Sequence, residues 1–267
     1  ETDWLDKNLN NVKIIDCSWH MPQTKRIGFE EYKKVHIPNA VFFDLDKNSK
    51  KNTSLPHMLV EKADWEKIVS KMGIQNDDKI ILYDNSDVIS SCRCWFNFIY
   101  FGHKSEMVHV LNGGLKKWIK EKRKITKDLK NIEISEYKGS ENKELIKNIK
   151  MIDQNIDTQE FKVIDARSRE RFEGKIPEPR EGLRSGNIKN SLCLPFNECL
   201  NDDKTFKNKN DLQMIFDAYT KNNQETEIVF SCGSGVTACV LALAYSLIND
   251  KYRPCIYDGS WAEYGKI

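Results

Sequence analysis

The sequence predicts an α/β protein of two tandem domains, each a mostly parallel sheet flanked by helices. Short apolar runs bounded by turn residues alternate with stretches whose apolar residues have helical spacing. This pattern occurs twice, and a charged segment separates the two copies. The 267 residues are enough for two domains, and a hydrophobic content of 39% is enough to form their cores.

Four segments of the chain recur in the same order, which indicates a duplication. Residues 12–19 (VKIIDCSW) and 161–168 (FKVIDARS) are both apolar runs that end in an aspartate. The matching residues are separated by 146 to 151 positions, in the pairs Asp16 and Asp165, His36 and Asn187, Asp84 and Cys232, and Gly113 and Gly259. One chance similarity between apolar strands would not preserve this order.

The composition changes between the copies. Residues 120–130 contain 8 charged residues out of 11, and residues 132–150 continue polar. We therefore predict an N-terminal domain at 1–130, a solvated linker at 131–150 and a C-terminal domain at 151–267. An exposed helix end followed by a surface loop is the alternative.

Within each copy, helices are expected around residues 65–72 and 211–219, and buried strands at 80–83 and 228–230. Ligands of parallel sheets bind at the carboxyl ends of the strands. The loops that begin at Asp84 and Cys232 are therefore the candidate sites.

The charge balance excludes several classes of partner. Lys and Arg total 42 against 40 Asp and Glu, so no general field attracts nucleic acid or an anionic membrane. Residues 228–248 carry no charge, but Ser and Gly in their first half favour a strand, a loop and a helix over a membrane span. No Cys/His spacing is typical of a zinc site, and we expect neither a metal nor a cofactor.

The eight cysteines are expected to be reduced, because residues 1–30 hold no apolar signal stretch. This favours a cytoplasmic protein, or an organellar one whose targeting peptide has been removed. Cys92 and Cys94 are too close in sequence to bridge each other easily, and a redox role is the weaker option. Arg93 between them would support the domain interface or neutralise a cleft.

Cys232 lies between a predicted strand and a helix that begins at Ala238. The N–H groups and the dipole at a helix N-terminus favour a thiolate. Gly233 and Gly235 would let the backbone curl around the sulfur as an anion cradle. The alternative is a structural cysteine at a tight turn.

The segment Cys232-Gly-Ser-Gly-Val-Thr237 resembles the active-site loop of 3-mercaptopyruvate sulfurtransferases, the two-domain relatives of rhodanese. The duplicated layout and the closing Asp258-Gly-Ser-Trp261 are similar as well. The resemblance implies two rhodanese-like domains, of which only the C-terminal one holds the nucleophile. Asp84 at the equivalent N-terminal position fits, because a carboxylate cannot carry a sulfane sulfur.

The resemblance also implies the chemistry. Cys232 would attack the sulfur of 3-mercaptopyruvate, form a persulfide and release pyruvate, and a thiol acceptor such as reduced thioredoxin would remove the sulfur. Two half-reactions through a covalent intermediate imply ping-pong kinetics. Gly233, Gly235, Val236 and Thr237 would contact the substrate.

Arg171 and Arg180 match the two substrate-binding arginines of the family across a Pro-Glu-Pro turn. A guanidinium holds a carboxylate by two parallel hydrogen bonds. The alternative is a solvated basic loop with ion pairs to Glu170, Glu173 and Glu181.

His57 and Asp46 resemble a family His–Asp pair that handles protons together with Ser234 of the loop. Asp46 would orient His57, and Ser234 would relay a proton to or from the substrate. The segment departs from the family in its Lys/Asn-rich residues 47–54 and in Pro56, where relatives commonly have an acidic residue.

Three alternative functions remain. Thiosulfate sulfurtransferases carry basic residues after the cysteine, whereas this loop is neutral. Cysteine phosphatases need an arginine six positions after the cysteine, where Ala238 stands here. A non-catalytic module that binds a partner is the third, and the intact Cys232 argues against it.

Overall fold

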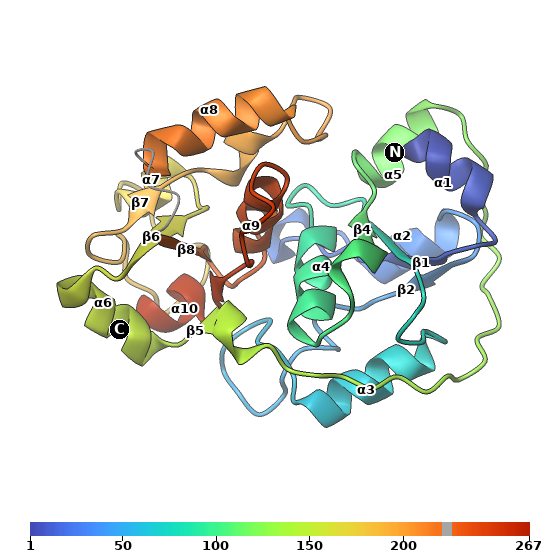
Figure 1. Cartoon of the computed structure of the whole chain (residues 1–267), viewed down its shortest axis with the longest axis horizontal. Coiled ribbons are helices and arrows are strands. Elements are labelled where there is room, and N and C mark those ends of the chain that lie inside the picture. The colour runs from blue at the N-terminus through green and yellow to red at the C-terminus, as the bar shows by residue number, and fades with distance from the viewer. Residues whose placement is uncertain (221–225) are drawn as a thin grey trace. The chain divides into compact units, whose positions relative to one another are not determined.

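The computed structural model describes residues 1–220 and 226–267, and contacts between residues divide the chain into two compact units (Figure 1). The first unit comprises Glu1–Lys51 and Leu59–Asn142, and the second comprises Asn52–Met58 and Lys143–Ile267. The short segment Asn52–Met58 thus packs with residues that come much later in the chain. The boundaries predicted for the domains and their linker remain predictions.

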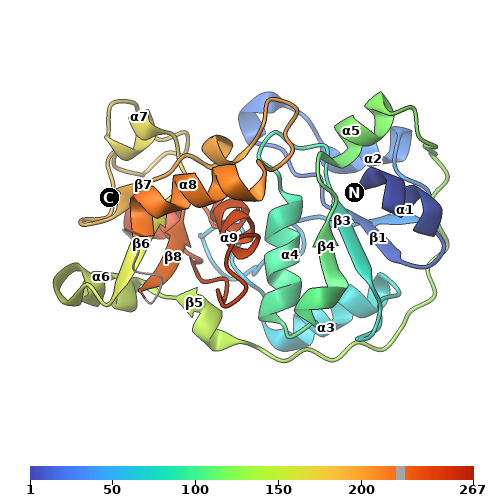
Figure 2. The same ribbon diagram turned by 45° about the horizontal axis from the view of Figure 1, so that its top comes forward.

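A parallel sheet in the order β2-β1-β3-β4 forms the centre of the first unit. Its strands are β1 (Lys13–Asp16), β2 (Ala40–Phe42), β3 (Ile80–Tyr83) and β4 (Val108–Val110). Helices α1 (Thr2–Asn8), α2 (Gly28–Lys34) and α5 (Gly114–Lys120) pack on one face, and α3 (Lys62–Lys71) and α4 (Ser91–Tyr100) on the other (Figure 2). Tyr32 and Trp118 bury the first face, while Trp65 and Phe98 meet edge to face on the second.

A five-stranded parallel sheet in the order β5-β9-β8-β6-β7 forms the second unit. Its strands are β5 (Ile146–Lys147), β6 (Phe161–Asp165), β7 (Leu192–Cys193), β8 (Glu227–Ser231) and β9 (Ile256–Tyr257). Its helices are α6 (Ile149–Thr158), α7 (Arg169–Phe172), α8 (Lys209–Thr220), α9 (Ala238–Ser246) and α10 (Ser260–Tyr264). Ile152 and Trp261 pack with Val229 on one face of the sheet, and Phe216 and Tyr245 contact Phe230 of the same strand.

The two units repeat each other in detail, which confirms the predicted α/β class. The order β7-β6-β8-β9 follows the same path as β2-β1-β3-β4. Asp16 and Asp165 end equivalent strands, and each accepts a hydrogen bond at 2.9 Å from the backbone N–H two residues later. The backbone carbonyls of Asp84 and Cys232 accept equivalent bonds from later residues, both at 2.9 Å.

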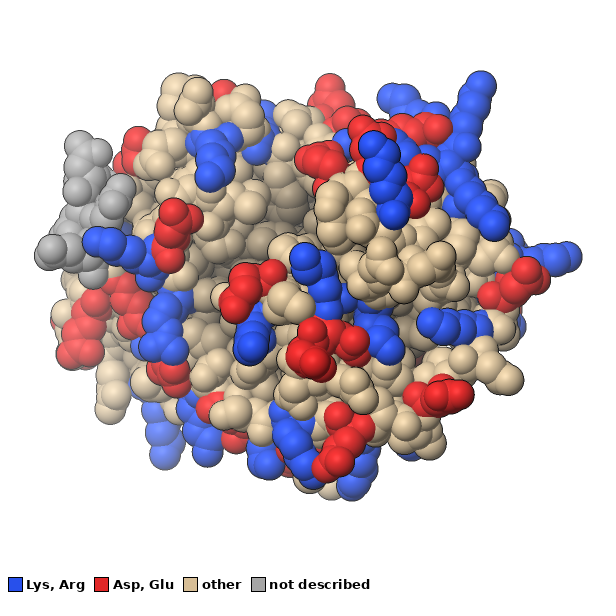
Figure 3. Space-filling view, turned by 45° about the vertical axis from the view of Figure 1, so that its right-hand side comes forward, with Lys and Arg blue, Asp and Glu red and all other residues tan. Residues whose placement is uncertain are grey.

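The uncharged stretch 228–248 forms most of β8, a loop and α9, as the sequence predicts. Among the described residues, no helix is long and apolar enough to cross a membrane. Lys and Arg side chains alternate with Asp and Glu over the face shown in Figure 3, in keeping with the balanced composition.

Candidate active site

The candidate loop begins at Cys232, directly after β8, and ends where α9 begins at Ala238. Cys232 is buried, with 2% of its surface exposed. Gly235 has a φ of 74°, a left-handed backbone conformation that side chains other than glycine's rarely adopt. In the first turn of α9, the N–H groups of Cys239 and Val240 donate to the carbonyls of Val236 and Thr237 at 3.2 and 3.1 Å. That the loop forms an anion cradle around the sulfur remains a prediction.

The C-terminal segment holds the start of this loop in place. The backbone N–H of Cys232 donates to Ser260 Oγ at 3.2 Å, and its carbonyl accepts from the backbone N–H of Trp261 at 2.9 Å. The carbonyl of Gly233 accepts from the N–H of Ala262, also at 2.9 Å. The Cys232 backbone is therefore held at both its N–H and its carbonyl, a role for Ser260 that sequence reasoning missed.

The Ser234 hydroxyl contacts the side chains of two other predicted site residues. His57 Nδ1 lies 3.0 Å from Ser234 Oγ, and Arg180 Nη2 donates to the same oxygen at 3.3 Å. His57 and Ser234 are both buried. His57 has a φ of 61°, a left-handed backbone conformation that is strained for a residue with a Cβ.

Both predicted arginines reach the loop at Gly233. A Cβ built on Gly233 would lie 3.1 Å from Arg171 Nη2 and 3.7 Å from Arg180 Nη1. Glycine thus leaves room for the two guanidinium groups directly beside the cysteine. The structure brings together Cys232, Gly233, Ser234, His57, Arg171 and Arg180, which the sequence names from three separate segments.

The ion pairs of the arginine loop differ from those expected for a solvated loop. Arg171 binds Glu178, donating from Nη2 at 2.6 Å and from Nε at 3.2 Å, and not the nearer Glu170 or Glu173. Arg167 Nη1 donates at 2.7 Å to Glu178 Oε1, the oxygen that also accepts from Arg171 Nε. Sequence reasoning missed Glu178, although its position between two prolines beside Arg180 marks a turn with a fixed shape.

The other predicted loop residues have less distinctive surroundings. Val236 is buried, and Thr237 is half-buried at the residue before α9. That they and Gly235 contact substrate remains a prediction.

Asp46 belongs to the first unit, where its two carboxylate oxygens accept hydrogen bonds from Trp19 Nε1 at 3.1 and 3.0 Å. Its predicted role beside His57 remains a prediction, because His57 belongs to the second unit.

The loop after β3 is equivalent to the Cys232 loop, and it is held by hydrogen bonds to the carboxylate of Asp84. Asp84 Oδ1 accepts from the N–H of Ser86 at 2.8 Å, and Oδ2 accepts from the N–H of Ser91 at 2.9 Å and from its hydroxyl. Burial raises the pKa of Asp84 above its ordinary value.

All eight cysteines are described, and none of them belongs to a disulfide, including Cys92 and Cys94 on α4. Arg93, between them, is fully buried. Within residues 1–220 and 226–267, no three His, Cys, Asp or Glu side chains are grouped so that they could hold a metal ion.

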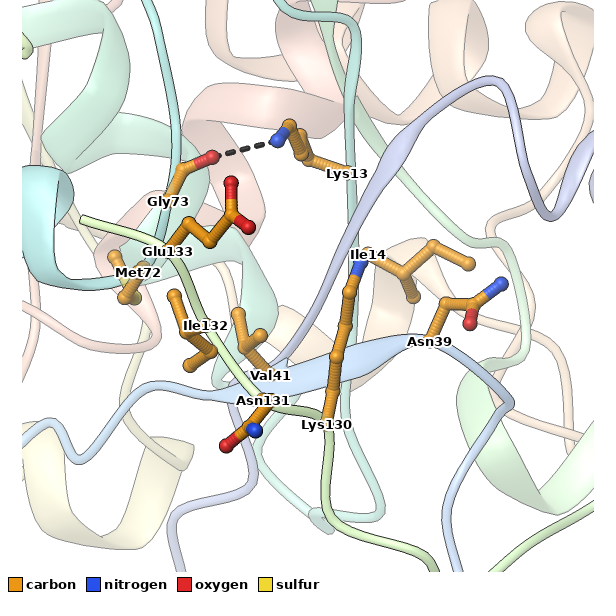
Figure 4. Close-up of a pocket in the computed structure, with 10 residues that line it drawn as sticks. All are labelled: Lys13, Ile14, Asn39, Val41, Met72, Gly73, Lys130, Asn131, Ile132 and Glu133. Carbon is orange, nitrogen blue, oxygen red and sulfur yellow. Dashed lines mark hydrogen bonds between the residues drawn. The ribbon is translucent and has the colours of Figure 1, made fainter. Parts of the chain in front are cut away.

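A cavity of about 310 Å³ lies in the first unit, at the amino end of β1 (Figure 4). Lys13 lines it and donates to the carbonyl of Gly73 at 2.6 Å, and Ile132 and Glu133 cover it. It contains none of the predicted site residues, so the loop at Cys232 remains the candidate active site.

Comparison with known proteins agrees with this geometry. The model of the rhodanese-like domain matches the chain twice, at residues 1–121 and 148–266. The Arabidopsis thaliana "Thiosulfate/3-mercaptopyruvate sulfurtransferase 1, mitochondrial" is 37% identical over 98% of this chain and 74% of its own. Thiosulfate sulfurtransferase from Bos taurus is 34% identical over 98% of this chain and 90% of its own.

Among solved structures, the 3-mercaptopyruvate sulfotransferase SseA from Escherichia coli aligns with a TM-score of 0.86 and 30% identity, covering 97% of each chain. The chain therefore belongs to the two-domain rhodanese-like sulfurtransferase family, and it is a sulfurtransferase with tandem rhodanese domains.

Proposed function

We propose that this sulfurtransferase takes sulfur from 3-mercaptopyruvate, carries it as a Cys232 persulfide and passes it to a thiol. The observation that carries the proposal is the hydrogen-bonded group around Ser234, whose hydroxyl lies between His57 Nδ1 and Arg180 Nη2 two residues after Cys232. A donor with a carboxylate, a ketone and a leaving carbon needs both an anion-binding group and a proton source. Arg180 and His57 meet these two needs at the Ser234 hydroxyl.

In the first half-reaction, the Cys232 thiolate attacks the donor sulfur, so that an S–S bond forms and the C–S bond breaks. The electron pair of the broken bond passes to carbon and gives the enolate of pyruvate. Ser234 supplies the proton that converts the enolate to pyruvate, with His57 renewing that proton. Arg171 and Arg180 hold the carboxylate and the developing negative charge.

In the second half-reaction, a thiol acceptor such as reduced thioredoxin attacks the outer sulfur of the persulfide. The Cys232–sulfur bond breaks and its electron pair restores the thiolate. The chemistry requires neither a metal nor an organic cofactor. The proposed compartment is the cytoplasm, with an organelle as the alternative because one relative is named mitochondrial.

Thiosulfate is the alternative donor, since two of the relatives carry thiosulfate in their names. Thiosulfate is doubly charged and has no carbon to be protonated, so it gives Ser234 and His57 no task. The uncharged Gly233-Ser234-Gly235 segment places no cation in the loop itself. A non-catalytic binding module is the other alternative, and it requires no persulfide.

A pyruvate-release assay with 3-mercaptopyruvate, run beside a sulfite-release assay with thiosulfate and with and without thioredoxin, tests the proposal. We expect a much higher kcat/KM for 3-mercaptopyruvate and a rate that rises with thioredoxin. Comparable efficiencies for the two donors would overturn the substrate assignment.

A further inference from the structure

We propose that Glu178 is a positioning residue that fixes the guanidinium of Arg171 over the Cys232 loop and thereby sets the affinity for the anionic donor. The inference rests on the proposed function in one respect, that Arg171 receives the negative charge of the donor. Glu178 itself touches no reacting atom.

Glu178 holds the guanidinium of Arg171 by two hydrogen bonds. The two side chains form a paired contact through Nη2 at 2.6 Å and Nε at 3.2 Å, so one edge of the guanidinium is fixed. The Glu178 side chain is 1% exposed, whereas that of Arg171 is 20% exposed. A buried carboxylate thus holds an arginine that still reaches the surface of the site.

Glu178 is itself anchored by Arg167. Arg167 donates to Glu178 at 2.7 Å and to Asp165, the last residue of β6, from Nε and Nη2. The Arg167 side chain is fully buried. Glu178 is therefore connected to the edge of the sheet by charge-assisted bonds, which are shorter and stronger than neutral ones.

Arg167 also connects Glu178 to the backbone of Cys232, through Trp261. Arg167 stacks on the Trp261 ring at 4.4 Å, and the backbone N–H of Trp261 donates to the carbonyl of Cys232 at 2.9 Å. The same rigid group thus supports the Cys232 backbone and the carboxylate that holds Arg171. Arg171 Nη2 then lies 3.1 Å from where a Gly233 side chain would begin, beside the reacting sulfur.

The charges of this group indicate that Glu178 orients Arg171 and does not strengthen the positive potential at the site. Asp165 and Glu178 balance Arg167 and Arg171 within this group. Glu178 therefore weakens the positive potential that Arg171 presents to an anion, while it fixes the orientation of the Arg171 guanidinium. If field strength governed affinity, removal of the carboxylate would tighten anion binding. If direction governs it, removal weakens binding.

The test is a double-mutant cycle of Glu178→Gln and Arg171→Ala. For each variant, KM and kcat are measured with 3-mercaptopyruvate. The dissociation constant of pyruvate is measured as well, because it reports binding without turnover. Glu178→Gln is expected to raise KM and the pyruvate dissociation constant roughly tenfold, with kcat changed far less. In the Arg171→Ala background it is expected to add nothing. Additive effects, or tighter binding by Glu178→Gln, would overturn the proposal.

Arg171→Lys covers the case in which Glu178→Gln does not fold. Lysine keeps the positive charge but cannot make the paired contact with Glu178. The affinity of Arg171→Lys for 3-mercaptopyruvate and pyruvate should therefore fall nearly as far as that of Arg171→Ala. Wild-type affinity in Arg171→Lys would overturn the proposal. If the wild-type protein uses thiosulfate and not 3-mercaptopyruvate, the proposed function fails by itself, and the same cycle on thiosulfate still decides the role of Glu178.

Discussion

His57 Nδ1 lies 3.0 Å from Ser234 Oγ, although 177 residues separate the two in the chain. The contact forms within the second unit, because the segment Asn52–Met58 packs there and Lys266 also donates to Ser54 at 2.9 Å. A histidine from the early part of the chain thus contacts a loop in its late part.

Ser234→Ala removes the hydroxyl between His57 and Arg180 and leaves Cys232 in place. We expect kcat for 3-mercaptopyruvate to fall about 100-fold, the usual size of a lost proton-transfer contribution. Steady-state pyruvate release measures it. Ser246→Ala is the matched control, since the Ser246 hydroxyl bonds only the backbone carbonyl of Leu243 among its described contacts. Equal activity of the two variants would exclude a relay through Ser234.

His57→Ala and His57→Gly separate the chemical role of the ring from its backbone strain. Both remove the ring and should lose the limb of the pH–rate profile that His57 provides. Glycine tolerates a φ of 61°, so the glycine variant should be the more stable by about 1 kcal/mol. Urea denaturation and pH–rate profiles give the two readouts. A normal profile in either variant would contradict the proton role.

Gly233→Ala places a methyl group 3.1 Å from Arg171 Nη2, closer than side chains normally come. Since Glu178 holds Arg171, the guanidinium cannot move freely away, and we expect KM for 3-mercaptopyruvate to rise several-fold while the melting temperature changes little. Gly139→Ala is the control, because its new methyl would have no neighbour nearer than 3.4 Å. An unchanged KM in Gly233→Ala would show that the arginines do not bind the donor there.

Much of this site follows from local sequence signals. The β8 strand, the loop at Cys232 and the start of α9 at Ala238 are visible because an apolar run meets a Gly-Ser-Gly turn. The duplication is visible because Asp16 and Asp165 end equivalent strands.

The remainder depends on contacts between distant segments. Glu178 competes with several other acidic residues of its loop, and only the folded turn brings it to Arg167 and Arg171. The membership of His57 in the second unit is likewise a long-range packing result. No sequence period records either contact, and the resemblance alone pointed to His57.

Asp16 should make the stability of the protein depend on pH. Burial, with a smaller contribution from the nearby Asp84, raises the pKa of Asp16 to about 7 from its ordinary 3.8. Between those values the folded state binds the extra proton, so this group stabilises the fold fully below about pH 4, and its contribution is lost as the pH rises through about 7.

Asp16→Asn removes that titration and keeps an oxygen that can accept from the N–H of Ser18. Between about pH 4 and about pH 8, the wild type should lose up to about 4 kcal/mol of unfolding free energy relative to the variant. Urea denaturation at several pH values measures the difference. Parallel stability curves for the two proteins would contradict a raised pKa for Asp16.

The central claim is that Cys232 carries the transferred sulfur. Intact-protein mass spectrometry after brief exposure to 3-mercaptopyruvate without an acceptor tests it most directly, with Cys232→Ser as the control. We predict a gain of one sulfur atom that maps to Cys232, is absent in Cys232→Ser and disappears when reduced thioredoxin is added. An unmodified Cys232 after pyruvate has been released, or sulfur gained by Cys232→Ser, would contradict the account.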